Sequence, residues 1–144
     1  ALLLVGFWTV VRAQDFATPV LTLEMPLVTK LLYGGIVEEL LLRWGLMSFF
    51  VWIAWRLSGR PQRVPPWTMW TGMVASSALF AVGHLPILYF ILPDPPLWFV
   101  GMTLAANFVP GMVFGWLYWR RGLEAAMAAH ALAHLFSTLI LTLR

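Results

Sequence analysis

The sequence predicts an all-α, polytopic membrane protein, and three observations lead to that fold class. Hydrophobic residues make up 61% of the 144 residues and charged residues only 10%, whereas a soluble domain carries about 25% charge. The mean hydropathy is +0.84. Apolar stretches of roughly 20 residues, enough for a helix to cross a bilayer, recur between short polar breaks. We therefore expect a transmembrane helical bundle that forms a single domain over residues 1–144.

The apolar stretches set the expected helices in order. Residues 1–11 are too short for a full span, so they are interpreted as the second half of one, with upstream helices missing. Residues 12–26 mix charged residues with prolines and indicate a loop or interfacial segment. Four full spans are then expected, at residues 27–57, 67–92, 97–119 and 123–143.

Proline, glycine and arginine mark the breaks between these spans. The segments SGRPQRVPP (58–66) and PDPP (93–96) cannot continue a helix, and Arg120, Arg121 and Gly122 form a tight turn. Small residues, such as the GMVFG step of the third span and the alanines of the fourth, predict close helix packing. Because the arginines gather in alternate connections, the positive-inside rule places those connections in the cytoplasm.

Charge and cysteine content exclude several function classes. The net charge of +3 is explained by loop arginines that orient helices. The chain has no basic run and no nucleic-acid motif, so no nucleic-acid partner is expected. It has no cysteine, which excludes a thiol nucleophile and thiolate metal sites. The expected surroundings are a lipid bilayer.

Six ionisable residues lie inside the predicted spans, where a charge costs at least a few kcal/mol and usually marks a functional site. They include all three histidines of the chain: Glu38, Glu39, Arg43, His84, His130 and His134. Counted from the helix ends at about 1.5 Å per residue, they lie at similar depth on the side away from the arginine-rich loops. They can meet if their helices are neighbours.

Helical geometry separates the two glutamates. Glu39 and Arg43 are four residues apart and share a face, so they can form an ion pair. Glu38 is turned away by about 100° and is predicted to point into the site. The alternative is that all three form one charge cluster that holds helices together.

The histidines permit more than one interpretation. His84 follows Phe80 by four residues, and a single histidine on an apolar helix is often a hydrogen-bonded packing residue. His130 and His134 share one helical face, which suits metal ligation or two donors aimed at one point. Zinc held by histidine and glutamate is chemically possible, although the sequence favours a site with no cofactor.

These parts fit a hydrolase that lacks a nucleophilic side chain. A carboxylate beside a histidine can activate water, and imidazole N–H groups can stabilise an oxyanion. Other protease types fit poorly because GxSxG and HExxH motifs are absent, and the two aspartates, Asp15 and Asp94, lie outside the spans.

Three short motifs in order resemble a known family. EELLLR (38–43) matches EExxxR, FAVGH (80–84) matches FxxxH, and HALAH (130–134) occupies the place of HxxxN/D. Over about residues 30–140 the chain resembles the CAAX protease and bacteriocin-processing family, the type II CAAX prenyl endopeptidases. The resemblance implies an intramembrane glutamate protease.

The resemblance also implies a role for each matched residue. Glu38 and His84 would activate the water, and His130 would stabilise the oxyanion. Glu39 and Arg43 would support the site, with Phe80 as a packing residue. The chain departs from the family pattern at His134, where Asn or Asp is usual; an imidazole can still donate a hydrogen bond to an oxyanion.

The resemblance leaves substrate and compartment open. The implied substrate is a peptide or membrane protein, possibly prenylated, or a bacteriocin-related peptide, in a prokaryotic cell membrane. CAAX processing needs a cytosolic site, whereas the loop charges place this site nearer the other face. Two alternatives are a non-catalytic scaffold, similar to the anterior-pharynx-defective subunit of γ-secretase, and a zinc-dependent membrane hydrolase or transporter.

Overall fold

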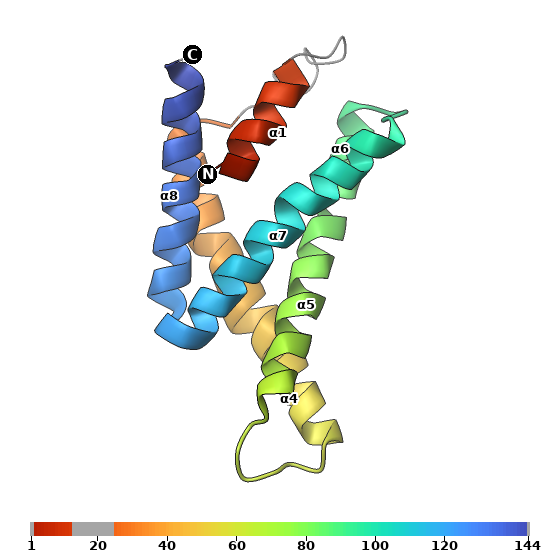
Figure 1. Cartoon of the computed structure of the whole chain (residues 1–144), viewed down its shortest axis with the longest axis vertical. Helices are drawn as coiled ribbons and strands as arrows, with labels where there is room; N and C mark the ends of the chain where they lie inside the picture. Colours follow the sequence, from red (N-terminus) through yellow and green to blue (C-terminus); the bar gives the residue numbers. More distant parts are fainter. Residues whose placement is uncertain (1, 13–24, 144) are drawn as a thin grey trace.

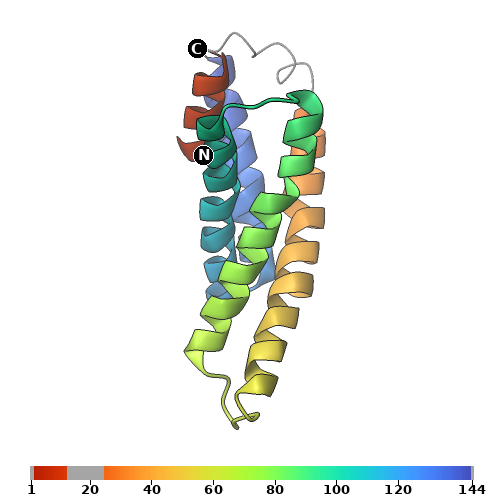
Figure 2. The same ribbon diagram turned by 90° about the vertical axis from the view of Figure 1, so that its right-hand side faces the viewer.

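The computed structural model describes residues 2–12 and 25–143, and most of the predicted interfacial segment 12–26 lies outside them. The described residues form helices and connections without a strand. The long helices run side by side, and the first helix, α1 (Leu2–Arg12), lies against the last, α8 (Leu123–Thr142), at the upper end of Figure 1. Both termini and the connection at residues 92–96 lie at this end, and the connection at residues 58–65 lies at the other (Figures 1 and 2).

The predicted helix at 27–57 forms one helical run with the expected ends but an unexpected middle. Its elements are α3 (Leu27–Thr29), η1 (Lys30–Glu38), η2 (Leu40–Met47) and α4 (Ser48–Leu57). The two central elements are π-helical: the N–H of Ser48, for example, donates to the carbonyl of Arg43, five residues back. Such wide turns are rare and are frequently found at functional sites. Here they carry the glutamate pair and its arginine.

The predicted span at 67–92 bends at His84, which separates α5 (Pro66–Gly83) from α6 (Leu85–Ile91). Pro86 has no N–H to continue the helical ladder. The N–H of His84 donates to the carbonyl of Ala81, three residues back. The carbonyl of Phe80, which this N–H would reach in a regular α-helix, is thereby left for another donor.

The last two predicted spans are α7 (Leu97–Arg121) and α8 (Leu123–Thr142). They are joined at Gly122, whose φ of 95° is accessible to glycine at little cost. This tight turn sets α8 beside α7 (Figure 1). Pro110 lies inside α7 and deprives the carbonyl of Ala106 of its helical donor.

Three helical stretches in the described part are long and apolar enough to cross a membrane: Pro66–Ile91, Leu97–Arg121 and Leu123–Thr142. The sequence predicted four full spans. The difference is the run from Leu27 to Leu57, which π-helical turns divide into several shorter helices. The all-α bundle is confirmed, and the first apolar segment forms the helix α1.

Small residues hold the helices close together, as predicted. A Cβ added at Gly35 would lie 2.9 Å from the Cβ of Ala131, and one at Gly115 would lie 2.9 Å from Cγ of Met73. These approaches join η1 to α8 and α5 to α7. Such close backbone approach is a main means of association for helices in lipid. It brings the charged part of the 27–57 run against α8.

Candidate active site

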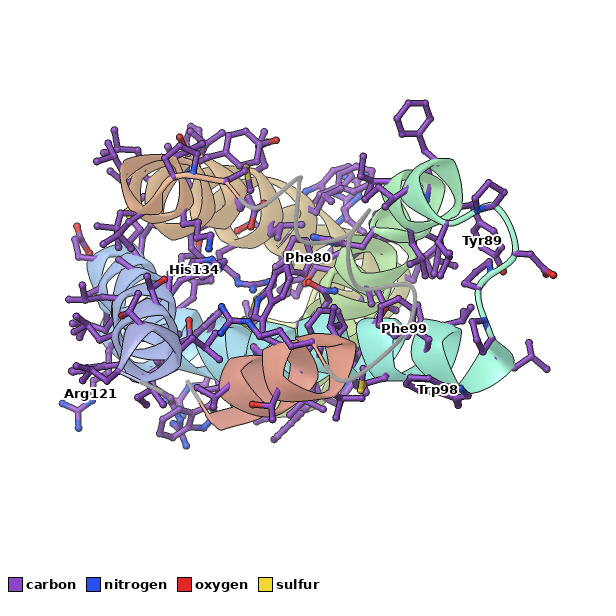
Figure 3. All side chains as sticks on the ribbon, turned by 90° about the horizontal axis from the view of Figure 1, so that it is seen from above. Phe80, Tyr89, Trp98, Phe99, Arg121 and His134 are labelled. Atoms are coloured by element: carbon purple, nitrogen blue, oxygen red, sulfur yellow. The ribbon has the colours of Figure 1, made fainter. Side chains whose placement is uncertain are left out.

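A cavity of about 610 Å³ lies between η1, α5, α7 and α8, and we call it the site cavity. Four of the predicted site residues line it together with Phe80: Glu38, His84, His130 and His134. Figure 3 shows Phe80 and His134 extending toward the space between the helices, whereas Arg121 lies at the outer edge. The chain thus brings side chains from three separate helices into one enclosure. Glu39 and Arg43 do not line it.

Glu39 lies behind the cavity in a fully buried polar network. Its side chain and that of Arg43 are both 0% exposed, and Arg43 Nε donates to Glu39 Oε2 at 2.9 Å. A second contact joins Arg43 Nη2 to Glu39 Oε1 at 3.4 Å. The predicted ion pair is therefore present, and its two-pronged geometry fixes the carboxylate.

The same carboxylate also holds a histidine, which the sequence did not predict. His130 Nδ1 donates to Glu39 Oε1 at 2.8 Å. This bond leaves the other ring nitrogen, Nε2, to face the site cavity. The imidazole is further ordered by stacking on Phe114, with ring centroids 4.6 Å apart. Glu39 therefore positions a cavity-lining group and also pairs with Arg43.

Glu38 is held much more loosely than its neighbour. Its side chain is 19% exposed, and its contact within the described residues is a long one, Oε2 to His130 Nε2 at 3.9 Å. A carboxylate in this position has lone pairs available to a water or a substrate group. The predicted division between a paired Glu39 and a cavity-facing Glu38 agrees with this geometry.

The backbone bend fixes the tautomer of neutral His84. Its Nδ1 lies 2.9 Å from the carbonyl oxygen of Phe80. A carbonyl can only accept, so Nδ1 carries the hydrogen. The Phe80 ring packs edge-on against the imidazole at 4.6 Å. In the neutral ring, Nε2 is thus left as an acceptor in the cavity.

His134 completes a stack of two imidazoles on α8. Its ring centroid lies 4.9 Å from that of His130, with the ring planes 23° apart. Across from it, Gly34 leaves room for the ring, since a Cβ there would lie 2.8 Å from His134 Nε2. The predicted spacing of four residues therefore does place both rings on one face. That face points at the glycine pair of η1.

Asn107 is a polar residue of the cavity that the sequence reasoning missed. It lines the site cavity, and its Nδ2 donates to the carbonyl of Thr103 at 2.8 Å. A neutral amide carries no charge, so it does not stand out among the ionisable residues of the predicted spans. Its position in the middle of the third predicted span was the available signal.

A smaller cavity of about 240 Å³ adjoins the site cavity. The two share lining residues, including Lys30, His84, Asn107 and His134. Its other walls are mainly apolar side chains of α1, α6 and α7, among them Phe7, Leu88 and Phe99. The site therefore has an apolar side compartment.

The histidine and glutamate side chains of the site are not arranged as the ligands of a zinc ion. Zinc in a catalytic site takes three protein ligands at about 2.0–2.2 Å. Over residues 2–12 and 25–143, no group of three or more histidine or acidic side chains is arranged to hold a metal ion.

A comparison with protein families gives a match over most of the chain. A model of the family described as type II CAAX prenyl endopeptidase, Rce1-like, matches residues 20–136. This range contains both glutamates, Arg43, Asn107 and the three histidines of the site. Neither a curated protein nor a solved structure matches the chain.

Proposed function

The chain belongs to the Rce1-like family of type II CAAX prenyl endopeptidases, and on that premise we propose an intramembrane endopeptidase that uses water activated by Glu38 and His84. The observation that carries this proposal is the sharing of one cavity by Glu38, His84, His130 and His134. The family and the apolar helices indicate an integral membrane protein of the CAAX-protease type. The mechanism below is our inference from the contacts.

The first step is the activation of water. Glu38, with free carboxylate lone pairs in the cavity, accepts a proton from a water molecule. Nε2 of His84, which is an acceptor because Nδ1 is bound to the carbonyl of Phe80, takes the second hydrogen bond of that water and aims its oxygen. The oxygen attacks the carbonyl carbon of the peptide bond and forms a tetrahedral intermediate.

The second step is stabilisation of the oxyanion. A protonated His130 donates Nδ1–H to Glu39 and presents Nε2–H to the developing negative charge. The Glu39 carboxylate stabilises the positive charge of that ring, as a preorganised partner should. His134, stacked beside it, offers a second N–H. The intermediate collapses when the carbon–nitrogen bond breaks, and Glu38 passes its proton to the leaving nitrogen.

The substrate we propose is an extended peptide at the end of, or within, a membrane-embedded protein. The mainly apolar cavity suits an apolar segment, and the adjoining compartment of about 240 Å³ offers room for an apolar side chain or lipid group next to the scissile bond. Both a prenylated CAAX peptide and a bacteriocin-related peptide meet these requirements. The cleavage assay below distinguishes the two classes.

The decisive experiment compares Glu38→Gln with the wild type on two peptide pools in lipid nanodiscs. One pool carries C-terminal prenylcysteine and the other is unmodified, and mass spectrometry locates cleavage. Glu38→Gln keeps the side-chain shape but removes the base, so we expect kcat/KM to fall by about 10²–10⁴-fold. Glu124→Gln, the same change at an exposed position of α8, is the control and should cleave as the wild type does.

Two outcomes would contradict this mechanism. Full activity of Glu38→Gln would exclude this carboxylate as the base. Zinc present in stoichiometric amount, whose removal by a chelator abolishes cleavage and whose return restores it, would replace the metal-free mechanism with a metal-dependent one.

A further inference from the structure

A second cavity, more open than the site cavity, lies at the opposite end of the bundle. It has a volume of about 440 Å³ and is formed where α4, α5 and α7 approach the two arginine-bearing connections. We call it the tryptophan cavity, because Trp52, Trp55 and Trp119 line it together with apolar side chains and Tyr118. Its volume falls in the usual range of ligand pockets, about 300–1,000 Å³.

Two guanidinium groups lie on tryptophans of this cavity. Cζ of Arg56 is 5.3 Å from the centre of the Trp52 ring, and Cζ of Arg120 is 4.7 Å from the centre of the Trp119 ring. Such cation–π contacts orient the arginines while leaving their N–H groups for other partners. In the described ranges neither arginine forms an ion pair with a carboxylate.

The charge at this end of the molecule favours an anion. The α4–α5 connection lies at the lower end of Figures 1 and 2, and the α7–α8 turn lies above it. These two connections and the helix ends beside them carry five arginines, whereas the acidic residue among them is Glu124. Clusters of basic residues next to membrane helices attract anionic lipid head groups. Tryptophan, in turn, is enriched where a membrane meets water.

We propose that the tryptophan cavity binds one anionic phospholipid, with an acyl chain among the tryptophans and its phosphate on Arg56 or Arg120, each of which lies on a tryptophan that lines the cavity. The cavity supplies apolar walls for the acyl chain, and the arginines beside its tryptophans supply positive charge for the phosphate. An uncharged lipid surface would need the tryptophans but gain nothing from the arginines. A free phosphate ion would use the arginines but leave the cavity unfilled.

The cavity wall is connected to the buried ion pair of the site. Ser48, which lines the cavity, donates its hydroxyl to the carbonyl of Arg43 at 3.1 Å and contacts the hydroxyl of Tyr118 at 3.1 Å. A lipid held against this wall stabilises the segment on which Arg43 lies. Bound lipid should therefore raise the melting temperature of the whole protein.

The test measures lipid retention and thermal stability of the full chain in detergent. Wild type, the double variant Arg56→Gln/Arg120→Gln and the control Arg63→Gln/Arg121→Gln are each titrated with phosphatidylglycerol or phosphatidylcholine and observed by native mass spectrometry. We expect one phosphatidylglycerol to bind the wild type and raise its Tm. Loss of both positive charges beside the cavity should weaken this binding about 30-fold. The control, with the same charge removed from the same two connections, should change it less than about threefold.

Further arms separate the possible ligands. Val64→Trp, which adds a large ring to a residue lining the cavity, should weaken phosphatidylglycerol binding while both arginines remain. Inorganic phosphate alone should not raise the Tm. The proposal is overturned if phosphatidylcholine binds as tightly as phosphatidylglycerol, or if the two double variants lose affinity equally, since that would indicate only general surface charge. A rise in Tm with phosphate alone would also overturn it.

Discussion

The two faces of the 27–57 helix hold their charged groups in very different ways. On one face, Glu39 is fully buried and bound to both Arg43 and His130. On the other, Glu38 is partly exposed in a cavity, with its nearest charged partner at 3.9 Å. The two carboxylates are adjacent in the chain, yet the oxygens of Glu39 accept hydrogen bonds from protein side chains and, in the described part of the chain, those of Glu38 do not. Position, more than residue type, decides which of them is available for chemistry.

The largest expected effect is on stability, and it should separate the two glutamates. Glu39→Gln leaves Arg43 buried without its counter-charge, which costs about 3–5 kcal/mol. Glu38→Gln removes a loosely held, partly exposed group and should change stability by less than about 1 kcal/mol. Thermal unfolding followed by tryptophan fluorescence measures both. Equal losses in the two variants would mean that the three charges act as one cluster.

The next effect tests the cavity face alone. His84→Ala removes the acceptor that aims the water, so we expect kcat/KM to fall about 100-fold while the Tm stays close to that of the wild type. Tyr89→Phe, on the exposed side of α6 (Figure 3), is the matched control and should keep both values. A folded His84→Ala protein with normal cleavage would leave this histidine as a packing residue only.

The smallest effects are expected at two adjacent glycines. Gly34 faces His134 in the site cavity, and Gly35 packs against Ala131 of α8. Gly34→Ala would place a Cβ 2.8 Å from His134 Nε2, so the ring must move; we expect about a tenfold loss of activity with little loss of stability. Gly35→Ala would place a Cβ 2.9 Å from the Cβ of Ala131, which pushes two helices apart and should cost about 1–3 kcal/mol. Activity and Tm are measured for both. The comparison fails if the two variants behave alike.

Much of the fold could be predicted because apolar length and proline placement are local properties of the chain. The ends of the long helices and the turn at Gly122 follow from them. The π-helical turns at Lys30–Glu38 and Leu40–Met47 could not be predicted. In an apolar run, the sequence pattern of a π-helical turn does not differ from that of an α-helical turn. The bend at His84 had a signal in Pro86, two residues beyond it.

The contacts between site residues on the same helix could be predicted from the sequence. The Glu39–Arg43 pair and the shared face of His130 and His134 follow from a spacing of four residues. The bond from His130 to Glu39 joins residues 91 positions apart, and no spacing rule reaches that far. It depends on how closely η1 approaches α8, which is set by tertiary packing at Gly34 and Gly35. The roles in catalysis remain predictions.

The bend at His84 gives the cavity a polarity. Because a backbone oxygen of α5 takes the Nδ1 hydrogen, that wall presents a lone pair to the interior, whereas the α8 wall presents ring nitrogens that can donate. In the proposed mechanism that lone pair accepts a hydrogen of the attacking water, and the ring nitrogens of α8 face the carbonyl oxygen of the peptide bond. A kink in the main chain would thus decide from which side of the cavity water approaches the peptide carbon.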